Sequence, residues 1–214
     1  MTESKLREQI CEMAASMFAR GLTGGASGNI SARTEDGGLL VSPTGSSFGS
    51  LDPARLSRFD DRGQLVGGDQ PTKEMPLHSA FYETRGKTGA VVHLHSTHAV
   101  AWSMMPDIDP QNLLPPLTAY AVMRLGKVRL LPFFVPGDPA MGDAVRGLAG
   151  KRSAVVLANH GPVVAGKDLE AAVYAMEELE ETAKLALLLK GHQPRMLTSG
   201  QVQKVVDKFD VDWD

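Results

Sequence analysis

Three histidines and one glutamate are the residues whose types and spacing point most directly to chemistry. His93 and His95 are two apart in the apolar run Val91-Val92-His93-Leu94-His95, and alternation along a strand places both imidazoles on one face. Such a pair alone fits hydrogen-bonded core histidines as well as a metal site. His160, at a turn after a second apolar segment, and Glu74, at the expected start of a helix, favour the metal. Three imidazoles and a carboxylate are the ligands expected for Zn²⁺ or a similar divalent ion in a catalytic site.

Two more histidines lie close in sequence to this set. His78 follows Glu74 by four residues, so the two share one face of the expected helix, and His98 follows His95 by three. Either could orient a metal ligand through a hydrogen bond. Direct ligation by either residue is the less favoured alternative.

Two segments of small residues offer the groups that bind a phosphate ester. They are Gly24-Gly25-Ala26-Ser27-Gly28-Asn29-Ile30-Ser31 and Ser42-Pro43-Thr44-Gly45-Ser46-Ser47. Neither has the lysine and spacing of a nucleotide P-loop, but their backbone N–H groups and hydroxyls suit a small phosphate. From these residues alone, ordinary glycine and serine turns are the favoured alternative.

Composition narrows the class of partner and of cofactor. The chain has 214 residues, a formal net charge of −3, 43% hydrophobic residues and no run of Lys and Arg interleaved with aromatics, so we expect no nucleic-acid partner. The charged first residues and the absence of a long apolar stretch predict a cytoplasmic protein without membrane association. Cys11 is the only cysteine, so a metal would need His and carboxylate ligands.

Two amphipathic helices are predicted near the ends of the chain. Apolar residues recur at helical spacing over 3–20 and over 168–190, and a glycine follows each segment. The polar face of the second helix is acidic, and an acidic run of this kind is expected to be solvated. It carries Glu177, Glu178, Glu180 and Glu181.

The middle of the chain is predicted to form a β-sheet. Short apolar runs between Gly, Ser, Asp and Pro predict short antiparallel strands over 21–68. Two buried strands are expected over 89–97 and 153–159, with a long loop over 106–116. Together these elements predict one α/β domain, 1–214, with a largely antiparallel sheet and flanking helices.

Taken in order, several motifs resemble those of the class II aldolase/adducin family, over nearly the whole chain. They are Gly28-Asn29-Ile30-Ser31, Thr44-Gly45, Pro71-Thr72-Lys73-Glu74, His93-Leu94-His95 and Asn159-His160-Gly161. The resemblance implies a three-layer α/β/α sandwich around a mostly antiparallel sheet. It also implies a C4 homotetramer with active sites at the subunit interfaces.

The resemblance assigns roles to the candidate metal ligands. It implies that His93, His95 and His160 bind one zinc ion per subunit, and that Glu74 acts as acid/base and also ligates the metal when no substrate is bound. Mn²⁺, Co²⁺ and Fe²⁺ are open alternatives, because a site of three histidines and a carboxylate suits them as well. Tyr120 is similar to a tyrosine that reaches into the site of the neighbouring subunit.

A candidate substrate-binding set includes four residues, Asn29, Thr44, Gly45 and Thr72, whose positions match those that hold the substrate phosphate in the family. The set is Gly28, Asn29, Thr44, Gly45, Thr72 and Lys73. Sugar-phosphate aldolases of the family have two serines before the acidic residue, whereas this chain has Thr72-Lys73. Lys73 is a candidate contact for a substrate carboxylate, and a solvent-exposed lysine is the open alternative.

Some segments are most similar to the 3-oxo-tetronate 4-phosphate decarboxylase branch of the family. They are Lys73-Glu74, Leu94, Met123-Arg124, Val135-Pro136-Gly137-Asp138 and 176–184. The resemblance implies a carbon-carbon lyase that converts a 3-oxo-tetronate 4-phosphate, a sugar-acid phosphate, to dihydroxyacetone phosphate and CO₂ through a metal-stabilised enediolate.

Other functions stay open at this point. A fuculose-phosphate type aldolase, a pentulose-phosphate 4-epimerase and a methylthioribulose-phosphate dehydratase would use the same metal chemistry. A non-catalytic interaction module of the adducin type is less favoured, because a scaffold gives no physical reason to keep the three histidines and the acid.

Overall fold

An eight-stranded sheet forms the centre of the chain in a computed structural model that describes residues 1–213. The strands are β1 (Asn29–Arg33), β2 (Leu39–Val41), β3 (Ser57–Phe59), β4 (Leu65–Gly67), β5 (Ala90–His93), β6 (Arg129–Leu131), β7 (Ala154–Leu157) and β8 (Gly161–Gly166). Their order is β4-β3-β2-β1-β5-β8-β7-β6. Strands β6 and β7 pair in parallel, and the other neighbours pair antiparallel. The predicted α/β class with a mostly antiparallel sheet is confirmed, and the sheet is mixed.

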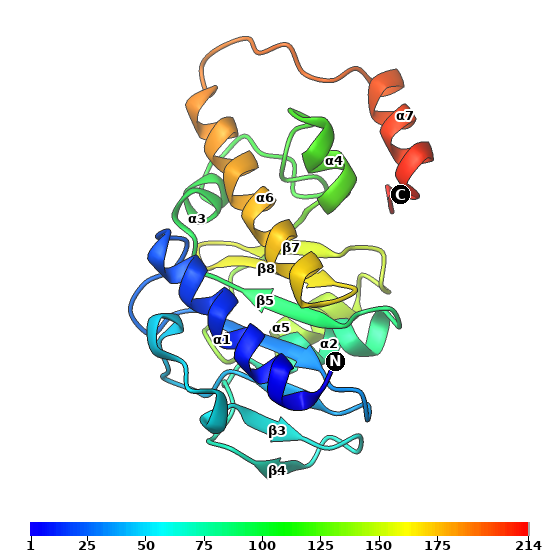
Figure 1. Ribbon diagram of the computed structural model, residues 1–214. Helices are drawn as coiled ribbons and strands as arrows, with labels where there is room; N and C mark the ends of the chain where they lie inside the picture. The colour runs from blue at the N-terminus through cyan, green and yellow to red at the C-terminus, as the bar shows by residue number, and fades with distance from the viewer. Residues whose placement is uncertain (214) are drawn as a thin grey trace.

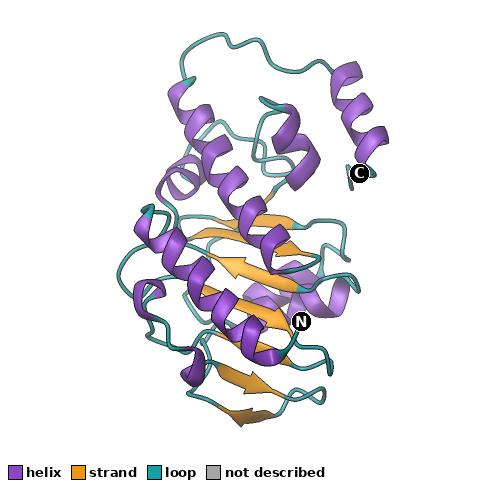
Figure 2. Cartoon of the chain, viewed as in Figure 1, coloured by secondary structure: helices purple, strands orange, loops and turns teal. Residues whose placement is uncertain are grey.

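Helices lie on both sides of this sheet (Figure 1). They are α1 (Glu3–Ala19), α2 (Met75–Thr84), α3 (Thr97–Ser103), α4 (Ala119–Leu125), α5 (Ala140–Arg146), α6 (Leu169–Leu188), α7 (Ser199–Phe209) and the 3₁₀ helices η1 (Phe48–Ser50) and η2 (Pro53–Arg55). In Figures 1 and 2, α1 and α6 cross the front of the sheet and α2 and α5 lie behind it. Among the described helices, none is long and apolar enough to cross a bilayer.

Two apolar cores, one on each face, hold the sheet and helices together. In β5, Val92 packs in the core that contains α1 and α6, whereas Val91 packs in the core of α2 and α5. This division follows from the alternation of side chains along a strand. Burying one Val or Leu contributes about 1.5–3 kcal/mol, so the summed contacts of the two cores fix the position of β5 and of the histidines at its end.

Both long helices agree with their predictions. Helix α1 buries Leu6, Ile10 and Met17 and ends at Ala19, one residue before the predicted limit. Helix α6 begins after Asp168, whose side chain accepts a hydrogen bond from the backbone N–H of Ala171 at 2.8 Å. Each helix therefore carries the apolar stripe that its spacing predicts.

The buried strand expected over 89–97 is shorter in the structure. Strand β5 ends at His93, and α3 already begins at Thr97. The N–H of Leu94 still donates to the carbonyl of Pro162 at 3.2 Å, so the chain stays extended for one more residue before it turns. Strand β8, which was not predicted, follows His160 directly and supplies this pairing.

The expectation of a fully solvated acidic face on α6 is wrong for Glu180, which is only 7% exposed. Its carboxylate accepts hydrogen bonds from the backbone N–H groups of His98 and Ala99, both at 2.9 Å, and pairs with the His98 ring at 2.7 Å. The first N–H groups of a helix have no partner within the helix, and a negative charge there is favourable. Glu180 therefore caps α3, and His98 is directed to Glu180.

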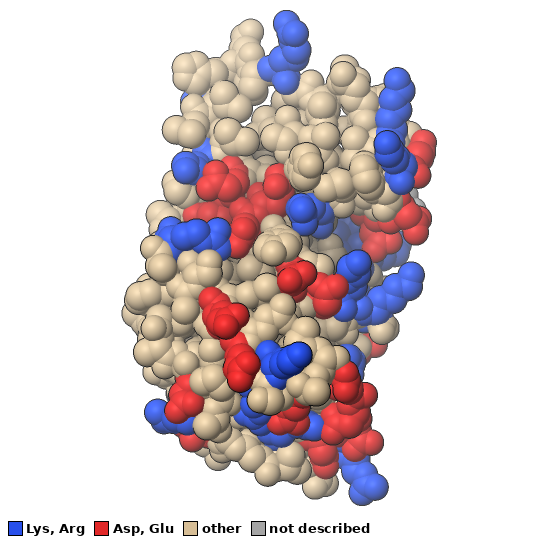
Figure 3. All heavy atoms as spheres, in the orientation of Figure 1, with Lys and Arg blue, Asp and Glu red and all other residues tan. Residues whose placement is uncertain are grey.

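Charged side chains also link the helices on the front of the molecule. Acidic and basic side chains are interspersed over the face shown in Figure 3. One pair, Arg20 with Glu177, joins the end of α1 to α6. An ion pair at such a partly exposed position contributes about 0–1 kcal/mol, so burial contributes more than charge to the packing of these helices.

Candidate metal centre and substrate pocket

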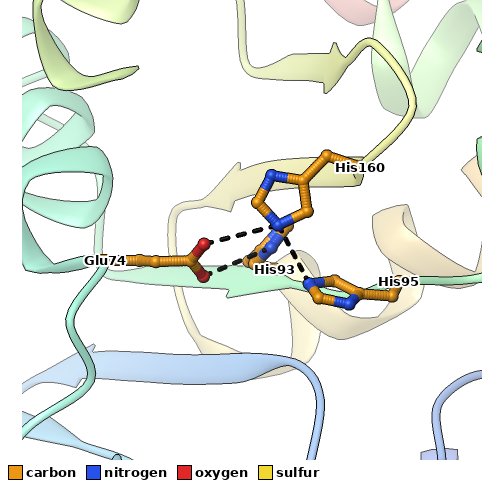
Figure 4. Close-up of side chains that lie close together, drawn as sticks. All are labelled: Glu74, His93, His95 and His160. Atoms are coloured by element: carbon orange, nitrogen blue, oxygen red, sulfur yellow. Dashed lines mark hydrogen bonds and ion pairs between the residues drawn. The ribbon is translucent and has the colours of Figure 1, made fainter. Parts of the chain in front are cut away.

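Four predicted ligands from three separate parts of the chain meet at one point (Figure 4). His93 is the last residue of β5, His95 follows it, His160 lies in the turn between β7 and β8, and Glu74 immediately precedes α2. One potential ligand atom from each residue lies within 4.8 Å of the others. The structure thus brings together the whole set of ligands that the sequence suggested.

The ligand atoms face one another across a small gap. The Nε2 atoms of His95 and His160 are 3.1 Å apart. The two carboxylate oxygens of Glu74 are 3.3 Å from Nε2 of His93 and 3.4 Å from Nε2 of His160. Three imidazole nitrogens and a carboxylate that converge in this way can surround a single cation.

His93 provides a direct test of whether a metal fits. Its Nδ1 lies 2.9 Å from the carbonyl oxygen of Pro162 and must donate the proton to it. This fixes the tautomer, so that Nε2 carries a lone pair toward the centre. Within the described chain this buried Nε2 has no hydrogen-bond partner. An unpaired buried polar atom costs about 1–3 kcal/mol, and a divalent ion would satisfy it.

Desolvation favours the neutral, metal-binding form of all three histidines, although His95 is the exposed member of the set. Desolvation is the largest cause that lowers the pKa of His93, His95 and His160 below the ordinary value for an imidazole. Neighbouring histidines lower the pKa of His93 and His95 further. Neutral imidazoles have free lone pairs, so the donor set fits Zn²⁺ or a similar divalent ion.

Two glycines allow the backbone to bring these histidines together. A Cβ on Gly161 would lie 2.1 Å from the carbonyl oxygen of Leu94, and a Cβ on Gly28 would lie 3.0 Å from that of His93. Gly28 also has a φ of +85°, which favours glycine. Asn159, immediately before His160, has a φ of 58°, a conformation that asparagine tolerates.

Glu74 is held in place from two directions. As expected, it stands at the start of a helix, where its N–H donates to the Thr72 hydroxyl at 3.2 Å. Its Oε2 accepts a hydrogen bond from Nδ2 of Asn29 at 2.6 Å. Asn29 lies opposite His93 in the β1–β5 pairing, so the sheet itself aligns the glutamate with the histidines.

A cavity of about 290 Å³ opens beside this centre. Its lining includes Glu74, His95 and the whole predicted substrate-binding set, namely Gly28, Asn29, Thr44, Gly45, Thr72 and Lys73. Pro136 and Gly137 line it as well. They belong to the segment Val135-Pro136-Gly137-Asp138, which was singled out in the sequence for its resemblance to one branch of the family. A β-bridge between Pro43 and Pro71 brings two of the lining loops together. The location of the set is established, and its contact with substrate stays a prediction.

Tyr120 lies apart from the other predicted site residues. It is on α4, is 61% exposed, and does not line the cavity within this chain. The guanidinium of Arg124 lies 5.9 Å from its ring centroid, and Arg124 does not line the cavity either. Any role of Tyr120 in catalysis therefore needs the neighbouring subunit that the sequence resemblance implies.

The structure adds a group of hydrogen bonds around His78 that the sequence reasoning missed. Ser31 and Tyr82 form a buried hydrogen-bonded group with His78, which in turn contacts Asn29. The spacing in the sequence was consistent with this group. Ser31 is two residues from Asn29 on a strand, and Tyr82 is four residues from His78 on a helix, so each pair shares one face of its element. Each was indistinguishable from an ordinary core residue by itself.

Comparisons with known proteins agree with this geometry. Residues 8–187 match the family described as Class II Aldolase and Adducin N-terminal domain. The 3-oxo-tetronate 4-phosphate decarboxylase of Escherichia coli (strain K12) is 45% identical over 203 residues, which are 95% of this chain and 96% of that protein.

Solved structures show the same likeness. The crystal structure of YgbL from Escherichia coli gives a TM-score of 0.92 at 44% identity, and the match covers 95% of this chain and 98% of that one. An L-fuculose 1-phosphate aldolase gives a TM-score of 0.84 at 25% identity, with 96% of each chain covered. The chain belongs to the class II aldolase and adducin family.

Proposed function

We propose that this chain is a metal-dependent carboxy-lyase that converts a 3-oxo-tetronate 4-phosphate to dihydroxyacetone phosphate and CO₂. The observation that carries the proposal is the position of Glu74, whose carboxylate lies 3.3 and 3.4 Å from two histidine nitrogens and borders the cavity. A proton donor is thereby placed beside a metal site and a substrate pocket. The 45% identical relative of that name supports the choice of substrate.

Glu74 has a defined task in this reaction. The bond between the carboxylate carbon and C2 of the substrate breaks, CO₂ leaves, and the electron pair stays on C2. Protonated Glu74 then donates its proton to C2, which completes dihydroxyacetone phosphate. His93, His95 and His160 would hold a divalent ion, which would supply Lewis-acid stabilisation of the negative charge that develops on the adjacent ketone oxygen.

The remaining lining residues would hold the two ends of the substrate. The Thr72 hydroxyl accepts a bond from the N–H of Glu74, so its own proton is free to donate to the phosphate. Thr44 and Gly45 add a hydroxyl and backbone N–H groups. Lys73 would contact the carboxylate and position it, since strong binding of that group would oppose the loss of CO₂.

The proposal includes the assembly and the metal that the family resemblance implies. Zn²⁺ is the proposed ion because neutral imidazoles and one carboxylate are among its preferred ligands. A homotetramer would let the exposed Tyr120 of one subunit reach the site of the next. The helices on both faces of the sheet and the two cores support a three-layer α/β/α sandwich. We also propose a cytoplasmic location, which cell fractionation would test.

Product analysis tests the proposal. Purified protein loaded with zinc is incubated with 3-oxo-tetronate 4-phosphate, and CO₂ and dihydroxyacetone phosphate are measured by mass spectrometry, with Glu74→Gln as the control. We expect both products from the unaltered protein and neither from the variant. Absence of CO₂ above background with the unaltered protein would exclude the decarboxylase.

Aldol cleavage is the second candidate, because the L-fuculose 1-phosphate aldolase shares the fold over 96% of each chain. Cleavage of a sugar phosphate leaves the same type of carbanion beside a ketone, and Glu74 could protonate it in the same way. Incubation with L-fuculose 1-phosphate separates the two functions. An aldolase would release dihydroxyacetone phosphate and an aldehyde, without CO₂.

A further inference from the structure

A chain of hydrogen bonds runs from Glu74 into the interior of the protein. Nδ2 of Asn29 donates to Oε2 of Glu74 at 2.6 Å, and Oδ1 of the same amide pairs with Nε2 of His78. Nδ1 of His78 is 2.7 Å from the Ser31 hydroxyl, which is 2.9 Å from the Tyr82 hydroxyl. Four consecutive bonds thus connect the proposed acid to a buried tyrosine.

The direction of each bond follows from the bond between Asn29 and Glu74. The structure places the amide nitrogen of Asn29 against Oε2 of Glu74, to which it donates, so the amide oxygen faces His78 and accepts. His78 therefore donates through Nε2–H, and its Nδ1 accepts from the Ser31 hydroxyl. Because Ser31 has a single proton, Tyr82 must donate to it. One arrangement of protons satisfies the whole chain.

Burial makes this arrangement costly to break. His78 and Ser31 have no exposed surface, and Asn29 and Tyr82 are 6% and 7% exposed. The low exposure deprives each group of water as an alternative partner. Strand β1 supplies Asn29 and Ser31 two residues apart, and α2 supplies His78 and Tyr82 four residues apart, so the two elements present matching polar faces.

We infer that His78 is a positioning residue for the proposed reaction, and that its neutral Nε2–H tautomer sets the orientation of the Asn29 amide. In that orientation, one amide hydrogen of Asn29 binds Glu74 and the second is free for an anion in the cavity that Asn29 lines. The inference rests on the proposed function, because it concerns the same acid and the same pocket. It names a residue that touches neither metal nor substrate.

Loss of the His78 donor would allow the Asn29 amide to turn over. The amide oxygen would then face Glu74, and Oε2 would lose the N–H donor that holds it in place. Glu74 would move from its place beside His93 and His160, and the cavity would lose an N–H donor. Proton delivery and phosphate binding would both suffer.

Two substitutions at position 78 distinguish a role of His78 in positioning the Asn29 amide from a role in packing alone. His78→Gln keeps an N–H group near the place of Nε2, whereas His78→Leu fills the space without a donor. We expect kcat to fall about 10- to 100-fold in His78→Leu, the size expected when a hydrogen bond that orients a charged group is lost. In His78→Gln we expect kcat to stay within about fivefold of the unaltered protein, with zinc content unchanged in both.

His192→Leu, at an exposed position outside this chain of bonds, is the matched control, and we expect kcat within about threefold of the unaltered protein. Equal kcat in His78→Leu and His78→Gln would overturn the inference, whether both were active or both inactive. If His78→Leu fails to fold, His78→Met replaces it, because methionine also fills the space without an N–H donor, and it should lower kcat by a similar factor.

A spectroscopic measurement tests the inference without any assay of activity. Protein labelled with ¹⁵N-histidine gives separate NMR signals for protonated and unprotonated ring nitrogens, and the His78 signals are identified by their loss in His78→Gln. We expect a protonated Nε2 and an unprotonated Nδ1, both with and without zinc. A protonated Nδ1 would contradict the inference. Failure of the decarboxylase assay alone would count against the proposed function and leave this result standing.

Discussion

Nε2 of His95 and Nε2 of His160 lie 3.1 Å apart, although 65 positions separate the two residues in the sequence. The first follows β5 and the second precedes β8, and these strands are neighbours in the sheet. The pairing of β5 with β8 therefore brings these two histidines of the proposed metal site together, and the geometry of the site depends on the register of this pair of strands. Folding and metal binding should accordingly be coupled.

Zinc should stabilise the protein through this site. A free concentration of zinc a hundredfold above the dissociation constant contributes about 2.7 kcal/mol, or a rise in Tm of about 5–10 °C for a chain of this size. Differential scanning calorimetry with and without zinc measures the shift. His160→Ala should abolish it, and His192→Ala, at an exposed position, should retain it. A shift of equal size in both variants would place the stabilising zinc elsewhere.

The metal-free protein should lose stability in mild acid. Burial lowers the pKa of His78 to about 3, so the unfolded chain binds a proton there that the folded chain does not. Stability from this group is complete above the unfolded pKa of about 6.5 and is lost as pH falls toward 3. Between pH 6.5 and 5 the expected loss is roughly 2 kcal/mol.

Urea titrations across this pH range measure that loss. The histidines of the metal site, whose pKa values are also lowered, add to it in the same direction. His78→Gln removes one titrating group and should flatten the dependence. A variant with the slope of the unaltered protein would show that His78 does not titrate on unfolding.

Gly161→Ala should destabilise the fold and weaken metal binding. The new Cβ would lie 2.1 Å from the carbonyl oxygen of Leu94, so the backbone beside His95 and His160 must shift. Overpacking of this kind costs about 1–3 kcal/mol. Gly200→Ala in α7 is the control, because no atom outside its chain neighbours and the backbone of its own helix lies within 4 Å of its added Cβ, and it should leave stability unchanged or raise it slightly. Equal effects would argue against the close approach of β8 to the residues after β5.

Glu180→Ala should destabilise the protein by about 1–3 kcal/mol, because it leaves the N–H groups of His98 and Ala99 without their acceptor. Glu180→Gln keeps one acceptor oxygen and should cost less. Glu181→Ala, at the adjacent exposed position, should change stability by less than about 0.5 kcal/mol. Chemical denaturation of the three variants compares them, and similar losses at 180 and 181 would contradict the cap.

The sequence predicted those parts of the fold that depend on local pattern. Both long helices carry apolar stripes at helical spacing, and His93 and His95 share a face because they are two apart in an extended segment. The early end of β5 was not predictable, because it depends on contacts with residues far along the chain. Glu180 caps the helix that follows β5, and Gly161 packs against Leu94.

In the candidate site, too, the sequence predicted what depends on local motifs and not what depends on contacts between distant segments. The metal ligands and the lining of the cavity were accessible from motifs, since each motif carries a recognisable polar group. The hydrogen bond between Asn29 and His78 could not be predicted from the motifs, because it requires β1 and α2 to be placed against each other. Helical spacing had joined His78 to Glu74, and the backbone N–H of His78 does donate to the carbonyl of Glu74 at 3.3 Å, but their side chains are linked through Asn29.

The most direct test of the central claim is decarboxylation in D₂O by the zinc-loaded protein. Mass spectrometry of the dihydroxyacetone phosphate, together with the CO₂ released, reports bond cleavage and proton delivery in one measurement. The account predicts one CO₂ per product molecule, deuterium at the carbon from which CO₂ departed, and no product above background with Glu74→Gln. Undiminished, deuterated product from Glu74→Gln, or no CO₂ from the unaltered protein, would contradict it.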